Sequence, residues 1–347
     1  MKVVVDDKIP YIREALAELG VEAIYLPGGK IDHEAVSDAD ALIVRTRTQC
    51  NADLLTGSRV QFIATATIGY DHIDTAYCEA QGIHWTNAPG CNAASVCQYI
   101  QSVLLLLHLE RGMELNKATI GVVGVGHVGT LVAEMARKWG MRVLLCDPPR
   151  ADRGEQGFVA LDTIAREADV ITIHTPLIRE GAHPTFHLAD DTFFRSLRRK
   201  PYFINTSRGE TTDTQALKRA LAGGGIAQCI IDVWEDEPEI DLSLLDRCYV
   251  GTPHIAGYSA DGKANATRMV LSALAEHFGL GEVPPINPPL PTTPYIQASS
   301  NAHALLQIYN PHIDSRKLKS HPECFEQLRG DYPLRREEQA YSLIIEG

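Results

Sequence analysis

Three charged residues, each in a loop that follows a predicted strand, could perform acid–base chemistry on a small anion. Arg208 lies in Asn-Thr-Ser-Arg-Gly, Glu237 in Trp-Glu-Asp-Glu-Pro and His254 in Thr-Pro-His-Ile-Ala-Gly. An imidazole exchanges protons near neutral pH, a carboxylate can hold the ring and stabilise its charged form, and a guanidinium fork binds carboxylates. Singly, such residues are more often structural or solvated. Together they predict a catalytic site with His254 as acid/base, Glu237 as its partner and Arg208 as the anion ligand.

A glycine-rich turn predicts a nucleotide site, because it follows a strand-like run at 120–123 and opens a helical run that ends near residue 139. In Gly-Val-Gly-His-Val-Gly, the first glycine permits the tight turn, the second lets the backbone approach a pyrophosphate, and the third lets the helix pack on the sheet. The phosphates would sit at the helix N-terminus, where unpaired N–H groups favour anions. The predicted contacts from this turn are Gly124, Gly126, His127, Val128 and Gly129.

Asp147 ends a second apolar run, 143–146, near the spacing expected of an acid that hydrogen-bonds the adenosine ribose. A carboxylate there repels a 2′-phosphate, so we expect NAD rather than NADP as cofactor, although Arg150 lies near enough to weaken this preference. An enzyme that oxidises an alcohol with nicotinamide needs a base and a cation beside the ring, and the three charged loops supply both. We expect no metal ion.

The alternation of strands and helices predicts an α/β protein with two doubly wound parallel-sheet domains, Rossmann-like or flavodoxin-like. The first series of strand-like runs is 3–5, 23–25, 41–44 and 62–64, with a helix at 11–19. After a helix at 95–110, the second series is 120–123, 142–146, 169–173, 202–205, 228–232 and 248–251, with helices at 161–167, 190–197 and 213–222. Because the carboxyl ends of parallel strands line one crevice, the glycine turn and the charged loops should share a rim.

Six prolines between residues 284 and 294 predict an extended connector after a helix at 259–279, which returns the chain to the first domain. Beyond the connector, a helix at 299–309 and apolar residues up to 345 predict a small module rather than a disordered tail. A module of this size struggles to bury its own core, so we expect it to pack on another surface.

Composition limits the partners of the chain. A formal net charge of −12 argues against nucleic acid or an anionic membrane, so an anionic substrate must be met by local arginines. No apolar run is long enough to cross a bilayer, and the first residues lack the pattern of a signal peptide. The eight cysteines contain no Cys-x-x-Cys pair and are expected to be reduced thiols in a cytoplasmic protein.

The chain resembles the D-isomer-specific 2-hydroxyacid dehydrogenases, in which an Arg, a Glu and a His in these loops form the active site. The resemblance is strongest to the branch of that family that oxidises 4-phospho-D-erythronate, and it extends along essentially the whole chain. The matching segments are 3–20, 39–51, 64–74 (ATATIGYDHID), 88–94, 146–150 and 252–260 (TPHIAGYSA).

This resemblance implies NAD-dependent oxidation of 4-phospho-D-erythronate to 2-oxo-3-hydroxy-4-phosphobutanoate, a step of pyridoxal 5′-phosphate biosynthesis. The residues that it implies for substrate contact are Thr46, Thr67 and Tyr258. Those that it implies for cofactor contact are Asp147, Thr175, Asp232 and Gly257. The implied domains are 1–95 with 258–282 for substrate, 96–257 for NAD, and 283–347 for homodimerisation. We expect substrate to close the cleft between the first two domains.

Some features leave alternatives open. Arg45 and Arg47 could help to neutralise a phosphate, but at least one of them is expected to be a solvated surface arginine. Ile68 and Tyr70 are bulkier than the residues usual in the family, and they would reshape the pocket unless they point into the core. The alternative functions are oxidation of another small 2-hydroxy acid, such as glycerate or 3-phosphoglycerate, and NAD sensing without chemistry.

Overall fold

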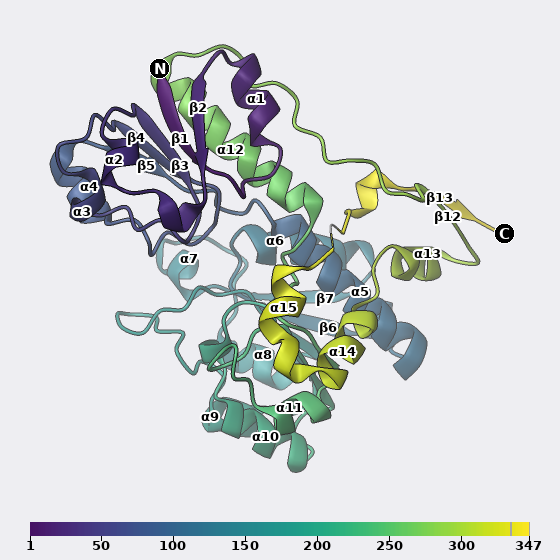
Figure 1. The fold of residues 1–347 in the computed structure, drawn as a ribbon. Coiled ribbons are helices and arrows are strands. Elements are labelled where there is room, and N and C mark those ends of the chain that lie inside the picture. Colours follow the sequence, from purple (N-terminus) through teal and green to yellow (C-terminus); the bar gives the residue numbers. More distant parts are fainter. Residues whose placement is uncertain (334, 347) are drawn as a thin grey trace. The chain divides into compact units, whose positions relative to one another are not determined.

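The computed structural model describes residues 1–333 and 335–346, and contacts along the chain divide it into two compact units (Figure 1). Unit 1 consists of Met1–Asn92 and Ser259–Thr292. Unit 2 consists of Ala93–Tyr258 and Thr293–Gly347. Each unit is built on a parallel sheet with helices on both faces, which confirms the predicted fold class.

Unit 1 contains a five-stranded parallel sheet with the strand order β2-β1-β3-β4-β5. The strands are β1 Lys2–Asp6, β2 Glu22–Leu26, β3 Ala41–Val44, β4 Phe62–Thr65 and β5 His84–Thr86. Strands β3 and β4 are buried along their whole length, as expected for parallel strands that are covered on both faces. The sequence pattern predicted four of these strands and missed β5, which has only three residues.

The helices of unit 1 lie on the two faces of its sheet, and each group of helices covers a layer of apolar side chains. These helices are α1 Ile12–Glu18, α2 His33–Val36, α3 Ala52–Leu55, α4 Thr75–Gln81 and α12 Ala260–Phe278. Val3 and Val5 pack in a cluster with α1 and α12, whereas Val4 packs in a second cluster with α2, α3 and α4. Because successive side chains of a strand point to opposite faces, the two clusters lie on the two sides of the sheet.

Unit 2 contains a six-stranded parallel sheet with the order β11-β10-β9-β8-β6-β7. The strands are β6 Thr119–Val123, β7 Arg142–Cys146, β8 Val170–Ile173, β9 Tyr202–Asn205, β10 Gln228–Ile231 and β11 Val250–Gly251. Leu145 of β7 also forms a single parallel bridge with Phe158, where a further strand of the first half would lie. The order reverses between β6 and β8, and ligands of open α/β sheets bind at such a switch point.

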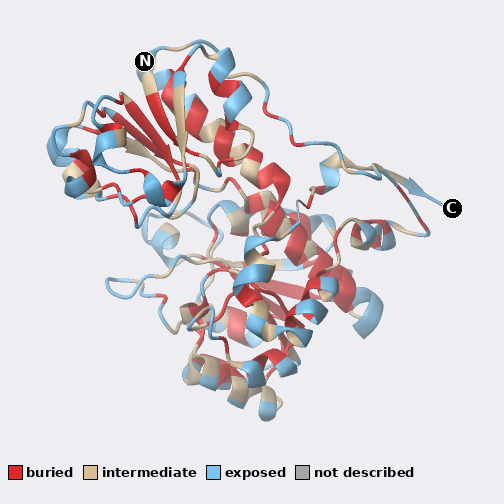
Figure 2. Cartoon of the chain, viewed as in Figure 1, coloured by how far each residue is buried: buried red, intermediate tan, exposed pale blue. Residues whose placement is uncertain are grey.

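The helices of unit 2 cover both faces of its sheet, so that the strands are buried in the centre (Figure 2). They are α5 Ala93–Arg111, α6 His127–Lys138, α7 Pro148–Asp152, α8 Leu161–Glu167, α9 Asp191–Ser196, α10 Thr214–Ala222 and α11 Leu242–Arg247. Short 3-10 turns in the described part of the chain are η1 Gly28–Lys30, η2 Leu115–Lys117, η3 Gly209–Thr211, η4 Pro322–Cys324 and η5 Glu338–Ala340. The long helix α5 packs on α6 and is buried over most of its length.

The C-terminal segment packs on unit 2, in agreement with the expectation that it lies on another surface. Its elements are β12 Tyr295–Ala298, α13 Asn301–Ile308, α14 Pro311–Ser320, α15 Phe325–Gly330 and β13 Ser342–Ile345. Strands β12 and β13 pair in parallel, α13 contacts α5, and α14 contacts β11. Within the described residues, no helix is both long and apolar enough to span a membrane. Whether this segment is a dimerisation domain stays a prediction.

Candidate functional site

The glycine turn connects β6 to α6 at the switch point of the sheet in unit 2. Gly124 has a φ of 86°, which L side chains rarely adopt, and a Cβ there would lie 2.7 Å from the carbonyl oxygen of His174. A Cβ on Gly129 would lie 2.0 Å from the carbonyl oxygen of Gly124, so only glycine lets the helix approach the strand end. Both glycines are therefore required by the fold itself.

Asp147 ties the end of β7 to the glycine turn. One carboxylate oxygen accepts the N–H of Val125 at 2.8 Å, and the other accepts the N–H of Arg150 at 3.1 Å. The Arg150 guanidinium donates to Glu155 at 2.7 and 2.5 Å and to the carbonyl of Val125 at 2.7 Å. Arg150 is thus already paired with a carboxylate, which reduces its ability to attract a 2′-phosphate.

Three features of the glycine turn and the neighbouring strand ends fit the pyrophosphate and nicotinamide nucleotide of NAD. Within the described part of the chain, no side chain caps the N-terminus of α6, so its N–H groups remain available to an anion. A Cβ at Gly126 would meet no described atom within 4 Å, which leaves the backbone open to a ligand. The hydroxyl of Thr175 is inaccessible to solvent and has no partner among the described residues. Such a buried polar group is costly unless a ligand satisfies it.

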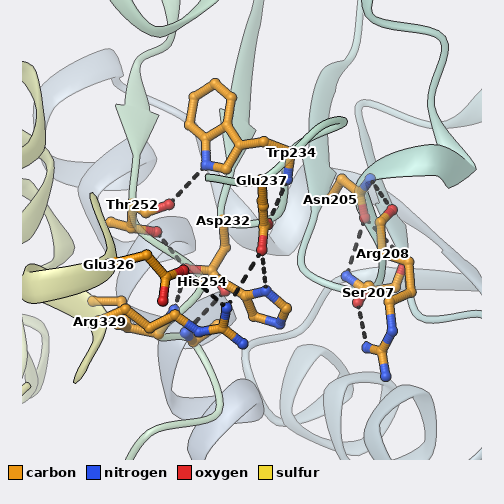
Figure 3. A network of polar contacts seen from close by, with 12 residues as sticks. Asn205, Ser207, Arg208, Asp232, Trp234, Glu237, Thr252, His254, Glu326 and Arg329 are labelled. Carbon is orange, nitrogen blue, oxygen red and sulfur yellow. Dashed lines mark hydrogen bonds and ion pairs between the residues drawn. The ribbon is translucent and has the colours of Figure 1, made fainter. Parts of the chain in front are cut away.

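Glu237 and His254 face each other at the ends of β10 and β11 (Figure 3). The Nδ1 of His254 lies 2.8 Å from Oε2 of Glu237, and Oε1 of the same carboxylate accepts the N–H of Trp234 at 2.9 Å. Burial raises the pKa of Glu237, but the hydrogen bond and charge of His254 lower it more, so the pKa lies below its usual value. The carboxylate is therefore ionised at neutral pH and suited to stabilise an imidazolium.

The His254 loop is shaped by Asp232, which is almost completely buried after β10. Its oxygens accept the hydroxyl of Thr252 at 2.6 Å and the N–H groups of Ile255 and Ala256 at 2.8 and 2.9 Å. His254 has a φ of 56°, an uncommon conformation for a non-glycine residue that this network holds in place. Gly257 follows in the next turn. Asp232 thus organises the His254 loop, whereas its predicted cofactor contact stays a prediction.

The Arg208 loop is shaped in the same way by Asn205, at the end of β9. The amide nitrogen of Asn205 donates to the carbonyl of Arg208 at 3.0 Å, and its oxygen accepts the N–H of Ser207 at 3.0 Å. The Arg208 guanidinium is exposed and donates to the carbonyl of Ser207 at 2.8 Å (Figure 3). Among the described residues, no hydrogen bond or ion pair joins it to Glu237 or His254. The structure therefore pairs two of the three predicted catalytic residues and leaves the third available.

Two predicted substrate residues lie in unit 1. Thr46 is exposed after β3. The hydroxyl of Thr67 donates to the carbonyl of Gly69 at 2.8 Å and lies 2.7 Å from the hydroxyl of Thr65, which His72 Nε2 approaches to 3.0 Å. Because Thr67 has one proton and donates it to Gly69, Thr65 must donate to Thr67. Thr67 therefore has only an acceptor position left for a ligand.

Ile68 and Tyr70 do not point into the core, and this alternative was wrong. Their exposed fractions are 38% and 45%, and the ring of Tyr70 packs on Trp85 with centroids 4.8 Å apart. The backbone of this loop is held by Thr67 and by Asn87, whose amide donates to the carbonyl of Ile68 at 2.7 Å. Their effect on the pocket stays a prediction.

Tyr258, the third predicted substrate residue, lies in unit 2 in the loop that follows His254. Its hydroxyl hydrogen-bonds to Arg329 of α15, and its ring meets Tyr332 edge-on at 6.2 Å. Arg329 also lies 3.7 Å from Oε2 of Glu237. Arg329 could not be predicted from the sequence, because no motif surrounds it and only the folded C-terminal segment brings it close to Glu237.

Comparisons with known proteins identify relatives along the whole chain. Residues 107–256 match the family described as D-isomer specific 2-hydroxyacid dehydrogenase, NAD binding domain. An erythronate-4-phosphate dehydrogenase of Bacteroides thetaiotaomicron is 58% identical over 345 residues, with 99% of both chains covered. One of Porphyromonas gingivalis is 43% identical, with 99% of this chain and 95% of that one covered.

Among solved structures, D-lactate dehydrogenase from Aquifex aeolicus, complexed with NAD and lactic acid, is similar in fold. The identity is 28% and the TM-score is 0.61, and the match covers 80% of this chain and 96% of that chain. The segment that matches the NAD-binding family includes the glycine turn, Asp147, Glu237 and His254. With full-length relatives well above 30% identity, the chain belongs to the erythronate-4-phosphate dehydrogenases, within the D-isomer-specific 2-hydroxyacid dehydrogenase family.

Proposed function

We propose that the protein oxidises 4-phospho-D-erythronate at C2 to 2-oxo-3-hydroxy-4-phosphobutanoate with NAD, in the biosynthesis of pyridoxal 5′-phosphate. The observation that carries the proposal is the 2.8 Å contact between Glu237 and His254 on the rim of an NAD-binding sheet. The full-length similarity to erythronate-4-phosphate dehydrogenases supports the choice of substrate. The free state of all eight cysteines supports a reducing, cytoplasmic location.

The geometry assigns the proton to one nitrogen of His254. Nδ1 donates to the ionised Glu237, so Nε2 carries the free lone pair and takes the proton from the C2 hydroxyl. Glu237 stabilises the imidazolium that results and keeps the ring in this orientation. Bound NAD supplies the acceptor for the C2 hydride. In this oxidation step the hydride leaves C2 and the proton leaves the oxygen bonded to it, so that the C2–O bond becomes a carbonyl.

Arg208 is placed to bind the substrate carboxylate. Its guanidinium makes one hydrogen bond to its own loop, which leaves the remaining donors for a bidentate contact with an anion. Thr67 can offer only an acceptor, so its partner on the substrate is a hydroxyl group rather than a carboxylate or phosphate oxygen. Arg45 and Arg47 remain the proposed phosphate ligands of unit 1, with Thr46 between them.

A substrate panel tests this function. Purified protein with NAD should reduce the cofactor with 4-phospho-D-erythronate, and D-erythronate, D-glycerate and 3-phosphoglycerate should be much poorer substrates. His254→Ala should lose most of the turnover while keeping its affinity for NAD, measured by quenching of protein fluorescence. Full turnover in that variant would remove the assignment of the base, and a preference for glycerate would replace the substrate.

We propose that the C-terminal segment forms a homodimer interface. Apolar side chains are exposed on its paired strands: Tyr295 is 67%, Ile344 50% and Ile345 40% exposed. A two-stranded sheet is marginal alone, so covering this apolar surface with a second copy would stabilise it. Ile344→Asp should sediment as a monomer where the wild type is a dimer. Leu242→Asp, at an apolar residue exposed elsewhere in unit 2, is the control and should remain dimeric.

A further inference from the structure

Arg329 is a second guanidinium at the catalytic cluster, and it comes from the C-terminal segment. It lies on α15, and its exposed side-chain fraction of 31% shows that it is partly covered by its surroundings. Figure 3 shows it beside Glu237 and His254, where it extends from α15 toward the catalytic carboxylate. Its second ion pair, with Glu326 at 3.7 Å, stays within the same helix.

The carboxylate of Glu237 is held from three directions. Oε1 accepts the N–H of Trp234 at 2.9 Å, and Oε2 lies 2.8 Å from Nδ1 of His254 and 3.7 Å from Nη1 of Arg329. The third contact is too long for a hydrogen bond. Arg329 therefore attracts the carboxylate as an ion pair and leaves the hydrogen bond between Glu237 and His254 in place. The positive charge also helps to lower the pKa of Glu237.

The contact between Arg329 and Tyr258 has a defined polarity. A guanidinium has only donors, so in the hydrogen bond between these residues the phenol oxygen accepts. The same guanidinium thus interacts with both the carboxylate of Glu237 and the phenol of Tyr258.

The position of α15 is fixed by packing. Phe325 is 1% exposed in the apolar core of unit 2, and Leu328 packs against the same cluster. Tyr332, two residues after the end of α15, donates its hydroxyl to Asp314 of α14 at 2.8 Å. Arg329 is therefore presented by an anchored turn rather than by a loose tail.

We propose that Arg329 is a positioning residue. It holds the side chains of Glu237 and Tyr258 in place, so that His254 and the substrate anion are correctly oriented for the reaction. The inference rests on the proposed oxidation and adds that the C-terminal segment completes the site within the same chain. Arg329 acts through its two partners and does not touch the reacting atoms.

Three single variants test this role. Arg329→Met removes the charge at similar size, Arg329→Lys keeps the charge without the fork, and Glu326→Gln breaks only the pair outside the site. Misplacement of catalytic groups costs up to about 100-fold, so kcat/KM should fall about 10-fold to 100-fold in Arg329→Met. Arg329→Lys should recover part of kcat but not the KM, because a point charge can face Glu237 without orienting Tyr258. Glu326→Gln should match the wild type.

A double-mutant cycle separates positioning from general damage. If Arg329 acts through Tyr258, adding Arg329→Met to Tyr258→Phe should raise KM much less than it does in the wild type. Independent, multiplicative losses in the double variant would overturn the proposal. So would equal losses in Arg329→Met and Glu326→Gln, which would indicate that the packing of α15 alone matters.

A readout without substrate keeps this test apart from the proposed function. The Nδ1 proton of His254, assigned by its loss in His254→Gln, should give a resolved proton resonance in the wild type because it is bound to Glu237. In Arg329→Met this resonance should broaden or shift, and in Glu326→Gln it should not. An unchanged resonance would reject the positioning of Glu237 whatever the substrate. Failure to oxidise 4-phospho-D-erythronate with a changed resonance would reject only the assigned substrate.

Discussion

Gly209 lies directly against the backbone of Trp234. A Cβ at position 209 would be 1.9 Å from the carbonyl oxygen and 2.0 Å from the carbonyl carbon of Trp234. Gly209 follows Arg208, and the N–H of Trp234 binds Glu237, so this contact joins the Arg208 loop to the Glu237 loop. The distance between the two functional groups is therefore set by backbone packing rather than by their own side chains.

Gly209→Ala should separate these two loops. Backbone atoms cannot give way as side chains can, so we expect a loss of stability of about 1–3 kcal/mol, as in overpacked cores. The value of kcat/KM should fall about 100-fold, because small displacements of catalytic groups have effects of that order. Thermal unfolding and steady-state kinetics measure both changes. Gly281→Ala, where a Cβ would meet no described atom within 4 Å, should change neither.

Much of the fold follows from the sequence because parallel strands buried on both faces form continuous apolar runs, such as those of β3 and β8. Short elements escape this pattern, and β5 has only three residues. Helix α14 was missed although a signal was present: Asn310 caps it and a proline begins it. Capping residues identify such helices better than hydrophobic periodicity does.

The contact between Glu237 and His254 could be predicted from the sequence, because a motif surrounds each of these residues. A contact that the fold alone supplies was not predictable. Arg329 is distant in sequence from Glu237 and has no local pattern. The role of Asp232 was also hidden, because an acid at a strand end could equally cap the next segment, and only the folded loop shows three donors converging on it.

Asp232→Asn should disorder the His254 loop. An amide replaces one acceptor oxygen by a donor, which would face either an N–H group or the hydroxyl of Thr252. Leaving buried polar groups unpaired costs about 1–3 kcal/mol each, so unfolding should require about 2–4 kcal/mol less free energy. Denaturant titration measures this loss, and kcat/KM should fall in parallel. Asp246→Asn, at an exposed position, should retain the stability of the wild type; a stable Asp232→Asn enzyme would contradict the role of this network.

His174 should make the stability of unit 2 fall in mild acid. The ring lies between the hydroxyls of Thr172 at 2.9 Å and Thr206 at 3.5 Å, and desolvation lowers its pKa to about 3. An unfolded histidine titrates near 6.5, so between these values the unfolded state binds the extra proton. The free energy of unfolding should therefore decrease as pH falls from about 6.5, by up to about 1.4 kcal/mol per pH unit.

Comparison with His174→Gln isolates this contribution. The amide cannot take up the proton, so the difference in unfolding free energy between wild type and variant should shrink steadily as the pH falls below about 6.5. Urea titrations at several pH values measure this difference. A difference that is constant between pH 7 and pH 4.5 would mean that the folded protein also protonates His174.

Cofactor choice should depend on the pairing of Arg150 with Glu155. Asp147 repels a 2′-phosphate, and the guanidinium that could attract one donates instead to Glu155 at 2.5 and 2.7 Å. Glu155→Gln removes the competing charge, so we expect the ratio of kcat/KM for NAD over NADP to fall by at most about 5-fold, because the pair is partly exposed to solvent. Glu18→Gln, on the exposed face of α1 in unit 1, should leave the ratio unchanged. If Glu155→Gln also leaves it unchanged, the discrimination against NADP resides in Asp147 alone.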